Sequence, residues 1–294
     1  MKLLGPDTIW VFISGSDEER FVDDISFGIQ CLLSRGHLLN KILVFIDQPL
    51  GPAFSSTYRL PTGLIVYATK ELQQVLGDQN SSTLAVVVTG HGNHNGVAAS
   101  PDIQPYNLLS IVKGLPSLGS ALIVLGQCFA GTFNYLEARS THPKTRKIIP
   151  PEVCIIGATD LNFSVSLPFD ISQDSNLVQF ACEKSWNANL FLFYFMLQLL
   201  KQIDIDGDGK HTVIDAYKVA GISTNGELLR GKVRAYIDIF QIIQRSTVSQ
   251  LKQTSVAQQL AEKAREDIAK VSEVILINQN PWILNANFAR QLEF

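Results

Sequence analysis

Two apolar segments end beside side chains that could carry out acid–base and nucleophilic chemistry. The segment VVVTGHGNHNGV carries His91, and the segment ALIVLGQCFAGTF carries Cys128. A thiol attacks as its thiolate, so a nearby histidine that accepts the proton would activate the sulfur and later protonate a leaving amine. Glycine lets backbone N–H groups approach a developing oxyanion, and Gly92 and Gly126 lie next to these two side chains. Together these residues suggest acyl transfer.

The elements that must position these residues follow an alternating order along the chain. We expect strands at 8–14, 41–47, 83–89, 120–126 and 152–159, with helices at 20–36, 69–76 and 106–112 between them. Strands that are apolar throughout are typical of a parallel sheet covered on both faces, and the alternation favours a doubly wound α/β fold. Because such folds bind ligands beyond the carboxyl ends of their strands, we expect His91 and Cys128 at one functional edge.

The chain changes character after about residue 176. An apolar helix reaches Gln202, an Asp/Gly-rich loop follows, and helical patterns run from Gly226 to about Ile277 as an amphipathic hairpin or helical cap. The closing stretch NPWILNANFARQLEF could add one more strand. We therefore predict a catalytic α/β core at 1–175 and a helical part at 176–294 that packs on it.

The order strand–His–Gly, one helix, then strand–Cys resembles the caspase and legumain superfamily of cysteine peptidases, over roughly residues 8–170. TGHG is similar to the base motif of that superfamily, and GQCFAG is similar to its nucleophile motif. The resemblance implies a caspase-like three-layer α/β/α sandwich with a mostly parallel central sheet. It also implies that His91 is the base, that Cys128 is the nucleophile, and that the amides of Gly92 and Cys128 form the oxyanion hole.

Two further segments look like the legumain branch and imply substrate contacts. ERFVDDI is similar to the start of that branch's first helix, where an arginine at the position of Arg20 lines the S1 pocket. GATDLNFSVS is similar to the opposite wall of the pocket. The substrate-binding candidates are Arg20, Gln127, Asp160, Ser164 and Ser166. Caspases carry Gln-Ala-Cys and legumains carry Glu-Ala-Cys where this chain has Gly-Gln-Cys. The resemblance therefore does not imply which substrate residue this chain prefers before the cleaved bond.

A second motif, DIDGDGKHTVID at 204–215, has the spacing of a calcium loop. Carboxylates fall at positions 1, 3 and 5, a glycine at 6 permits the sharp turn, and the last residue closes at position 12. The predicted ligands are Asp204, Asp206, Asp208, the carbonyl of Lys210, Thr212 and Asp215. The loop departs from the usual pattern because aspartate replaces glutamate at position 12. We expect bound Ca²⁺ with a structural or regulatory role, and no cofactor for the chemistry itself.

Composition limits the classes of partner. The chain has 294 residues, is 46% hydrophobic and carries a formal charge of −3, which favours neither nucleic acid nor an acidic membrane surface. The apolar stretch at 190–200 is about half the length that spans a bilayer. The cysteines form no CxxC pair, and no signal-peptide core begins the chain, so we expect free thiols and a cytoplasmic protein. The expected partner is a protein or peptide substrate.

The main prediction is a bacterial-type, caspase-like cysteine endopeptidase, and several alternatives stay open. A transamidase or ligase would use the same site with an amine in place of water. A catalytically silent interaction module would keep the fold without the chemistry. His94 is a rival base, whereas His37 and His142 are expected at the surface. A Rossmann nucleotide binder is disfavoured because no GxGxxG follows TIWVFIS.

Overall fold

The computed structural model describes residues 2–47, 60–171, 185–250 and 255–294, and its centre is a seven-stranded sheet. The strand order is β14-β11-β8-β5-β2-β3-β4. The strands are β2 (Ile9–Ser14), β3 (Ile42–Ile46), β4 (Val66–Tyr67), β5 (Thr83–Thr89), β8 (Ser120–Leu125), β11 (Glu152–Gly157) and β14 (Trp282–Leu284). All neighbours are parallel except β14, which runs antiparallel to β11. The predicted α/β class with a mostly parallel sheet is confirmed.

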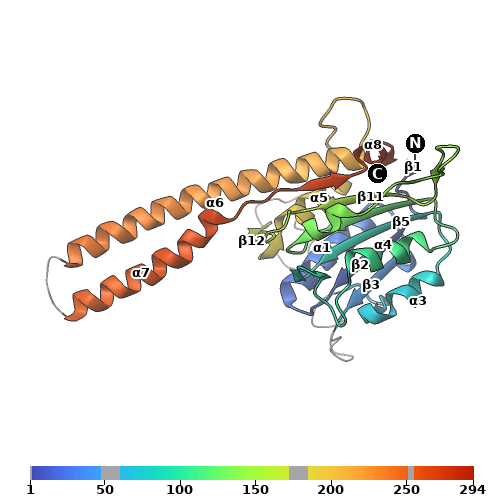
Figure 1. The fold of residues 1–294 in the computed structure, drawn as a ribbon. Coiled ribbons are helices and arrows are strands. Elements are labelled where there is room, and N and C mark those ends of the chain that lie inside the picture. The colour runs from blue at the N-terminus through green and yellow to red at the C-terminus, as the bar shows by residue number, and fades with distance from the viewer. Residues whose placement is uncertain (1, 48–59, 172–184, 251–254) are drawn as a thin grey trace.

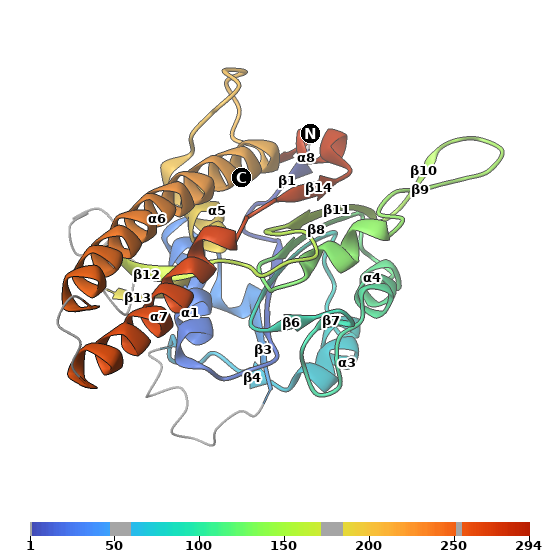
Figure 2. The same cartoon turned by 60° about the vertical axis from the view of Figure 1, so that its left-hand side comes forward.

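Helices cover both faces of this sheet, as Figure 2 shows. The helices α1 (Glu19–Ser34) and α5 (Leu190–Lys201) lie on one face, and α3 (Leu72–Gly77) and α4 (Pro105–Lys113) lie on the other. Along β2, Trp10 and Phe12 pack into the first apolar layer, while Val11 and Ile13 pack into the second. Both faces of each strand are thus removed from water, which explains why the strands are apolar throughout.

The C-terminal helices form a long hairpin that projects away from the sheet (Figure 1). Helix α6 (Val213–Gln250) and helix α7 (Ser255–Leu276) pack side by side, and the first part of α6 packs on α5. The expectation that this helix begins at Gly226 is wrong. It begins at Val213 because Asp215 caps its first turn, accepting hydrogen bonds from the backbone and hydroxyl of Thr212. In the described ranges, no helix is long and apolar enough to cross a membrane.

The smaller sheets join segments that are distant in the sequence. The expected boundary at residue 175 lies outside the described residues. Strand β12 (Ser166–Asp170) pairs with β13 (Ser185–Asn189), and β1 (Lys2–Leu3) pairs with β15 (Leu292–Glu293). The remaining elements are η1 (Leu39–Lys41), η2 (Thr69–Glu71), β6 (Gly92–Asn93), β7 (Gly96–Val97), η3 (Ala130–Tyr135), β9 (Ser140–Thr141), β10 (Ile148–Ile149) and α8 (Ala286–Ala289).

The expected surface position of His37 is also wrong. Its side chain is buried, and its ring meets the ring of Trp10 edge-on with centroids 5.8 Å apart. Burial, with the charge of Arg35 nearby, lowers the pKa of His37. This histidine belongs to the core beneath the end of α1 and takes no part in the edge that carries His91.

Candidate active site

The register of the sheet brings the predicted chemistry to one edge. Ser14 pairs with Thr89, Val88 pairs with Leu125, and Leu125 pairs with Gly157, so β2, β5, β8 and β11 end at nearly the same level. The loops that follow these four ends carry Glu18, His91, Cys128 and Asp160, in that order. Parallel strands that end together deliver their next residues to a shared surface, as the sequence predicts for His91 and Cys128.

The loop of His91 and the loop of Cys128 touch through their backbones. Gly92 lies so close to the turn after β8 that a Cβ added there would overlap the carbonyl group of Cys128 and come within 2.6 Å of the Gln127 Cγ. Only glycine permits this approach. Gly92 therefore has a steric role, because it lets the two loops approach. This role is separate from the oxyanion-hole N–H that the resemblance implies for the same residue.

The thiol of Cys128 lies against the loop that follows β11. The Ser164 backbone N–H points at the Cys128 Sγ at 3.3 Å. The next residue, Phe129, has a left-handed backbone with φ of 55°, and its N–H donates to the carbonyl of Asn162 at 2.8 Å. The Gly131 N–H donates to the carbonyl of Asp160 at 3.0 Å. These hydrogen bonds hold the turn of Cys128 and the 160–164 loop together, and the Cys128 side chain is left half-buried.

The imidazole of His91 has an acidic partner that the sequence did not indicate. His91 Nε2 is hydrogen-bonded to Glu18 Oε1, and the other oxygen of Glu18 accepts from Arg20 Nε at 3.0 Å. Partial burial acts to raise the pKa of Glu18, but the hydrogen bond and charge of His91 and the charge of Arg20 outweigh it, so the pKa is lowered. The ring of Phe21 meets the His91 ring edge-on, with centroids 5.0 Å apart. Glu18 and Phe21 together fix the orientation of the imidazole.

A buried polar network lies beneath both loops. The carboxyl of Asp24 on α1 accepts from Thr89 Oγ1 at 3.0 Å, from Trp186 Nε1 at 3.1 Å and from the Asn189 backbone N–H at 3.1 Å. Burial raises the pKa of Asp24 to about 7, against the opposing effect of these hydrogen bonds. The Asn189 amide donates to the carbonyl of Gly126 at 2.7 Å and to Ser164 Oγ at 3.1 Å. The network thus ties the end of the His91 strand to both sides of Cys128.

The residues predicted to contact the substrate do not line one common pocket. Arg20 lines a pocket of about 390 Å³ together with Glu18, Glu19, Asp23, Ser185, Trp186 and Asn187. Ser164 contacts the thiol, whereas Ser166 pairs with Asn189 in the β12–β13 sheet. The carboxylate of Asp160 instead accepts a hydrogen bond from the side-chain amide of Asn280 at 3.0 Å.

Gln127 differs most from its expected place on the substrate surface. Only 1% of it is exposed, and both polar atoms of its amide lack a hydrogen-bond partner within the described part of the chain. It fills the space beneath Gly92, in the contact between the two loops. A larger pocket of about 530 Å³ lies between α3 and α4, around Gln73, Tyr106 and Ser110, and it includes none of the predicted site residues.

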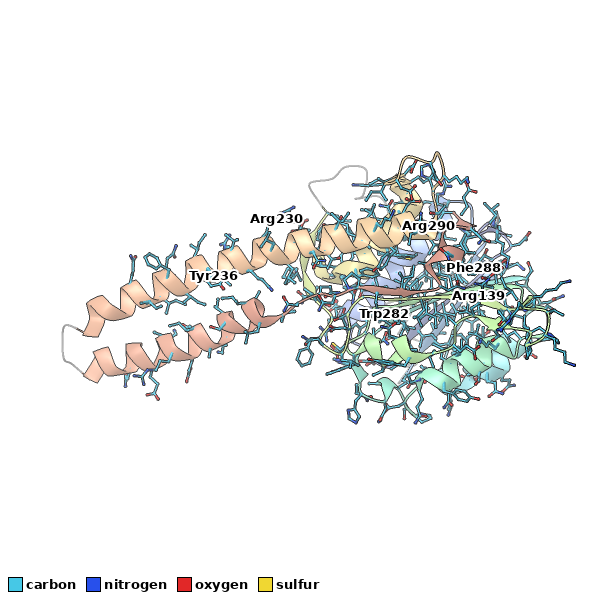
Figure 3. All side chains as sticks on the ribbon, turned by 45° about the horizontal axis from the view of Figure 1, so that its top comes forward. Arg139, Arg230, Tyr236, Trp282, Phe288 and Arg290 are labelled. Atoms are coloured by element: carbon cyan, nitrogen blue, oxygen red, sulfur yellow. The ribbon has the colours of Figure 1, made fainter. Side chains whose placement is uncertain are left out.

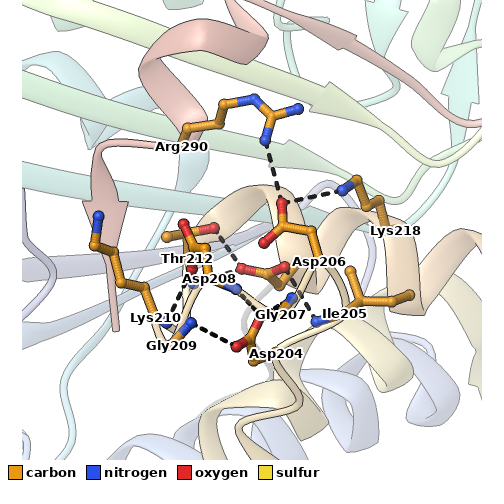
Figure 4. A network of polar contacts seen from close by, with 11 residues as sticks. Asp204, Ile205, Asp206, Gly207, Asp208, Gly209, Lys210, Thr212, Lys218 and Arg290 are labelled. Atoms are coloured by element: carbon orange, nitrogen blue, oxygen red, sulfur yellow. Dashed lines mark hydrogen bonds and ion pairs between the residues drawn. The ribbon is translucent and has the colours of Figure 1, made fainter.

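The calcium-type loop lies beside the C-terminus, where Thr212 bridges to Glu293, and Figure 4 shows its polar contacts. Carboxylate oxygens of Asp204, Asp206 and Asp208 lie within 4.8 Å of one another. Asp204 accepts from the backbone N–H groups of residues 207, 208 and 209, and Asp208 accepts from the Lys210 N–H at 2.9 Å. The hydrogen bond from Gly209 is the main cause of the lowered pKa of Asp204. Three of the six predicted ligands are therefore gathered around one point.

Thr212 and Asp215 have other partners. The Thr212 hydroxyl donates to Asp215 Oδ2 at 2.5 Å, and the other Asp215 oxygen accepts from the Ile205 N–H at 3.3 Å. Asp206 forms ion pairs with Lys218 at 3.3 Å and with Arg290 at 3.2 Å. The capping of α6 thus uses the carboxylate predicted at position 12, and two cations already balance the charge of Asp206.

Comparison with known proteins assigns no family: no protein-family model matches the chain, and no curated protein sequence matches it. The chemistry of the site is therefore argued from its own residues. Cys31 and Cys154 are free, fully buried thiols, and burial raises their pKa, while Cys182 lies outside the described residues. The rival base His94 lies at the exposed tip between β6 and β7, near Asp102.

Proposed function

We propose that this protein is a cysteine endopeptidase of the caspase and legumain type, with Cys128 as nucleophile and His91 as base. The observation that carries the proposal is the backbone contact of Gly92 with Cys128 at the common edge of four strands. A half-buried thiol and a histidine, on loops that touch through a glycine, supply the components of acyl transfer. In the same proposal, the central sheet and its two helical layers are the caspase-like sandwich.

The proposed reaction proceeds in two balanced steps. The Cys128 thiol gives its proton to His91, and the thiolate forms a bond to the carbonyl carbon of the substrate. Collapse of the tetrahedral intermediate breaks the C–N bond, and His91 returns the proton to the leaving amine. Water, deprotonated by His91, then attacks the thioester, which releases the carboxylic acid and restores the thiol.

Glu18 would define which nitrogen of His91 serves as the base. Because Nε2 is paired with the Glu18 carboxylate, the proton of the neutral ring is held there and Nδ1 keeps its lone pair. The carboxylate also stabilises the imidazolium that forms when the thiol is deprotonated. Glu18 is therefore a positioning residue, because it acts through His91.

A Glu18→Gln variant is expected to react with a thiol alkylator at Cys128 about 10- to 100-fold more slowly than the wild type near pH 6. The amide preserves the shape but loses the charge that favours imidazolium. The measurement is the alkylation rate of Cys128 as a function of pH, with Glu19→Gln as the matched control on the same turn. An unchanged pH profile would show that Glu18 does not orient the base.

Product analysis tests the proposed reaction itself. An unfolded protein substrate is incubated with the enzyme in water and in the presence of an added amine such as hydroxylamine. Hydrolysis predicts new carboxyl termini in water and partial conversion to hydroxamates with the amine. Products formed only when an amine is present would favour the transamidase alternative, and an absence of cleavage under both conditions would contradict the peptidase proposal.

We further propose that the loop of residues 204–215 binds Ca²⁺ through Asp204, Asp206 and Asp208. The gathered carboxylates and the left-handed Gly207 and Gly209, with φ of 75° and 80°, fit a hard cation in a tight turn. A bound cation would compete with Lys218 and Arg290 for Asp206. The loop leads directly into α6, and its end pairs with the C-terminus through Thr212 and Glu293. Its proposed role is to hold α6 and the C-terminal strand together.

Calcium at about 100 times its dissociation constant is expected to raise the free energy of unfolding by about 2.7 kcal/mol. An Asp204→Asn variant should lose most of this gain, because it removes a charge from the centre of the loop. The measurement is thermal unfolding with calcium, with magnesium and with chelator. Asp7→Asn, remote from the loop, should respond like the wild type, and equal stability of the wild type with calcium and with chelator would exclude the site.

A further inference from the structure

Exposed apolar side chains follow one face of α6 at heptad spacing. Their exposures range from 47% for Ile243 to 64% for Ile222. Successive members are separated by seven, four, three, four and three residues, and Gly226 fills the position within the first gap. The members are Ile222, Leu229, Val233, Tyr236, Phe240 and Ile243, and we refer to them with Gly226 as the outer seam. Alternating steps of three and four are the signature of a helix that packs against another helix.

Helix α7 does not cover this seam, because it packs on the other side of α6. A Cβ added to Gly231 would lie 4.0 Å from a methyl group of Val274 on α7, and Ile242 shares a small pocket with Val271. Two residues along a helix correspond to a rotation of about 200°, so Gly231 lies nearly opposite Val233. The outer seam therefore faces away from α7 on the projecting part of the hairpin, where Figure 3 labels Tyr236 and Arg230.

We propose that the outer seam binds the outer seam of a second copy of this chain, with the two α6 helices antiparallel and crossing at Val233. In this register Gly226 lies opposite Phe240 of the second copy, so a large aromatic side chain faces the position without a side chain. Leu229 and Tyr236 lie within one residue of facing each other, as do Ile222 and Ile243. Every member of the seam thus meets an apolar partner or a matching space, as a two-fold interface requires.

The charges beside the seam favour a second copy over an acidic partner helix. Arg230 is paired with Glu227 at 2.8 Å, and the Lys232 Nζ donates to Asn278 at 2.9 Å. Arg230 and Lys232, which lie close to Val233 on its N-terminal side, have partners within their own chain, so these two cations do not require carboxylates from a partner. A self-complementary apolar seam is then the dominant feature of the face.

The size of the seam is adequate for a dimer. It spans 22 positions from Ile222 to Ile243, or about 33 Å of helix. Its exposed apolar surface is on the order of 600 Å² per copy, against about 800 Å² per partner in a standard interface. Because the hairpin projects from the body, two copies can join along α6 without contact between their sheets (Figure 1). Two hairpins joined in this way would form a four-helix arrangement.

The first test is the mass of the native protein in solution at micromolar concentration. The proposal predicts a particle of twice the 32.4 kDa chain mass, and a Val233→Glu variant that sediments as a monomer with an unchanged thermal midpoint. Gln241→Glu, at an exposed position on the same helix but outside the seam, is the matched control and should remain dimeric. A monomeric wild type, or a dimeric Val233→Glu variant, would overturn the proposal.

Cysteine cross-linking tests the register independently of how Val233→Glu folds. In a chain with Cys128 and Cys182 replaced by serine, Val233→Cys should cross-link to its own copy. Ile222→Cys alone should not, because antiparallel pairing separates the two sites by about 33 Å. A mixture of Ile222→Cys and Ile243→Cys should give the mixed dimer. Self-cross-linking of Ile222→Cys would indicate parallel helices, and no cross-link at Val233→Cys would indicate that the seams do not meet; either result overturns the proposal.

Discussion

Replacing Cys128 or His91 with alanine is expected to reduce cleavage of an unfolded protein substrate by at least about 1000-fold. Loss of the thiol removes the nucleophile, and loss of the imidazole removes both the base and the proton donor for the leaving amine. Because the two groups act as a unit, the double variant should be no slower than the slower single variant. The measurement is the initial rate of cleavage at equal concentrations of folded protein.

The matched control for these variants is Cys154→Ala, which removes a fully buried thiol from the neighbouring strand β11. Its cleavage rate should equal that of the wild type, although its stability should fall because the substitution leaves a cavity. A Cys128→Ala variant that cleaves at the rate of the Cys154→Ala variant would show that the reaction does not pass through Cys128. Full activity of His91→Ala would shift attention to His94 as the base.

The second large effect concerns the buried carboxyl of Asp24, whose pKa is raised from 3.8 to about 7 by burial. Between those values the folded chain binds more protons than the unfolded chain, so the free energy of unfolding falls as pH rises. The stability contributed by protonated Asp24 is complete below pH 4 and is lost as pH passes through 7. An Asp24→Asn variant does not titrate there. Its stability relative to the wild type should therefore rise by about 4 kcal/mol between pH 4 and pH 8.

Urea unfolding of both proteins over this pH range measures the difference directly. Asp78→Asn, at an exposed position, should show a pH dependence parallel to that of the wild type. If the Asp24→Asn and wild-type curves are also parallel, Asp24 titrates at its ordinary pKa and its hydrogen bonds outweigh its burial. The network to Thr89 and Asn189 would then hold an ionised carboxylate at physiological pH.

The sequence was sufficient to place the five longest strands of the central sheet and the edge at which they end, but not the short strand β4. Strands such as 83–89 and 120–126 are buried on both faces, so their apolar runs mark their ends within a residue. The order of the loops then predicts that His91 and Cys128 lie at the same edge, through a general property of parallel sheets. The contact made by Gly92 agrees with this, because a glycine beside a strand end often marks a close backbone approach.

The partners of the two groups could not be predicted in the same way. Asp24 and Asn189 are separated by 165 residues, and their contact depends on how α1 packs beside β13. The same reasoning places Glu18 at this edge, because it follows the end of β2. The segment GSDEER contains other acidic residues as well, so the sequence did not show which of them contacts His91. Helix α6 passes through Gly221 and Gly226, which local propensity disfavours, because packing on α5 and α7 compensates.

The burial of Gln127 shows a further limit of reasoning from spacing. Its position before the nucleophile suggests a substrate contact, yet the approach of Gly92 encloses its side chain. The pocket beside Glu18 and Arg20 is instead built from the start of α1 and from β13, two segments far apart in the chain. The walls of this pocket depend on tertiary packing that the spacing of residues along the chain does not reveal.

The most direct test of the central proposal is limited alkylation of the native protein at mildly acidic pH, with the labelled cysteine mapped by mass spectrometry. Ordinary thiols are mostly protonated there, and burial keeps Cys31 and Cys154 protonated and inaccessible. An activated dyad predicts rapid labelling at Cys128 that disappears in His91→Ala. Labelling of Cys128 at the rate of a free peptide thiol, unchanged in His91→Ala, would contradict the dyad and favour a catalytically silent protein.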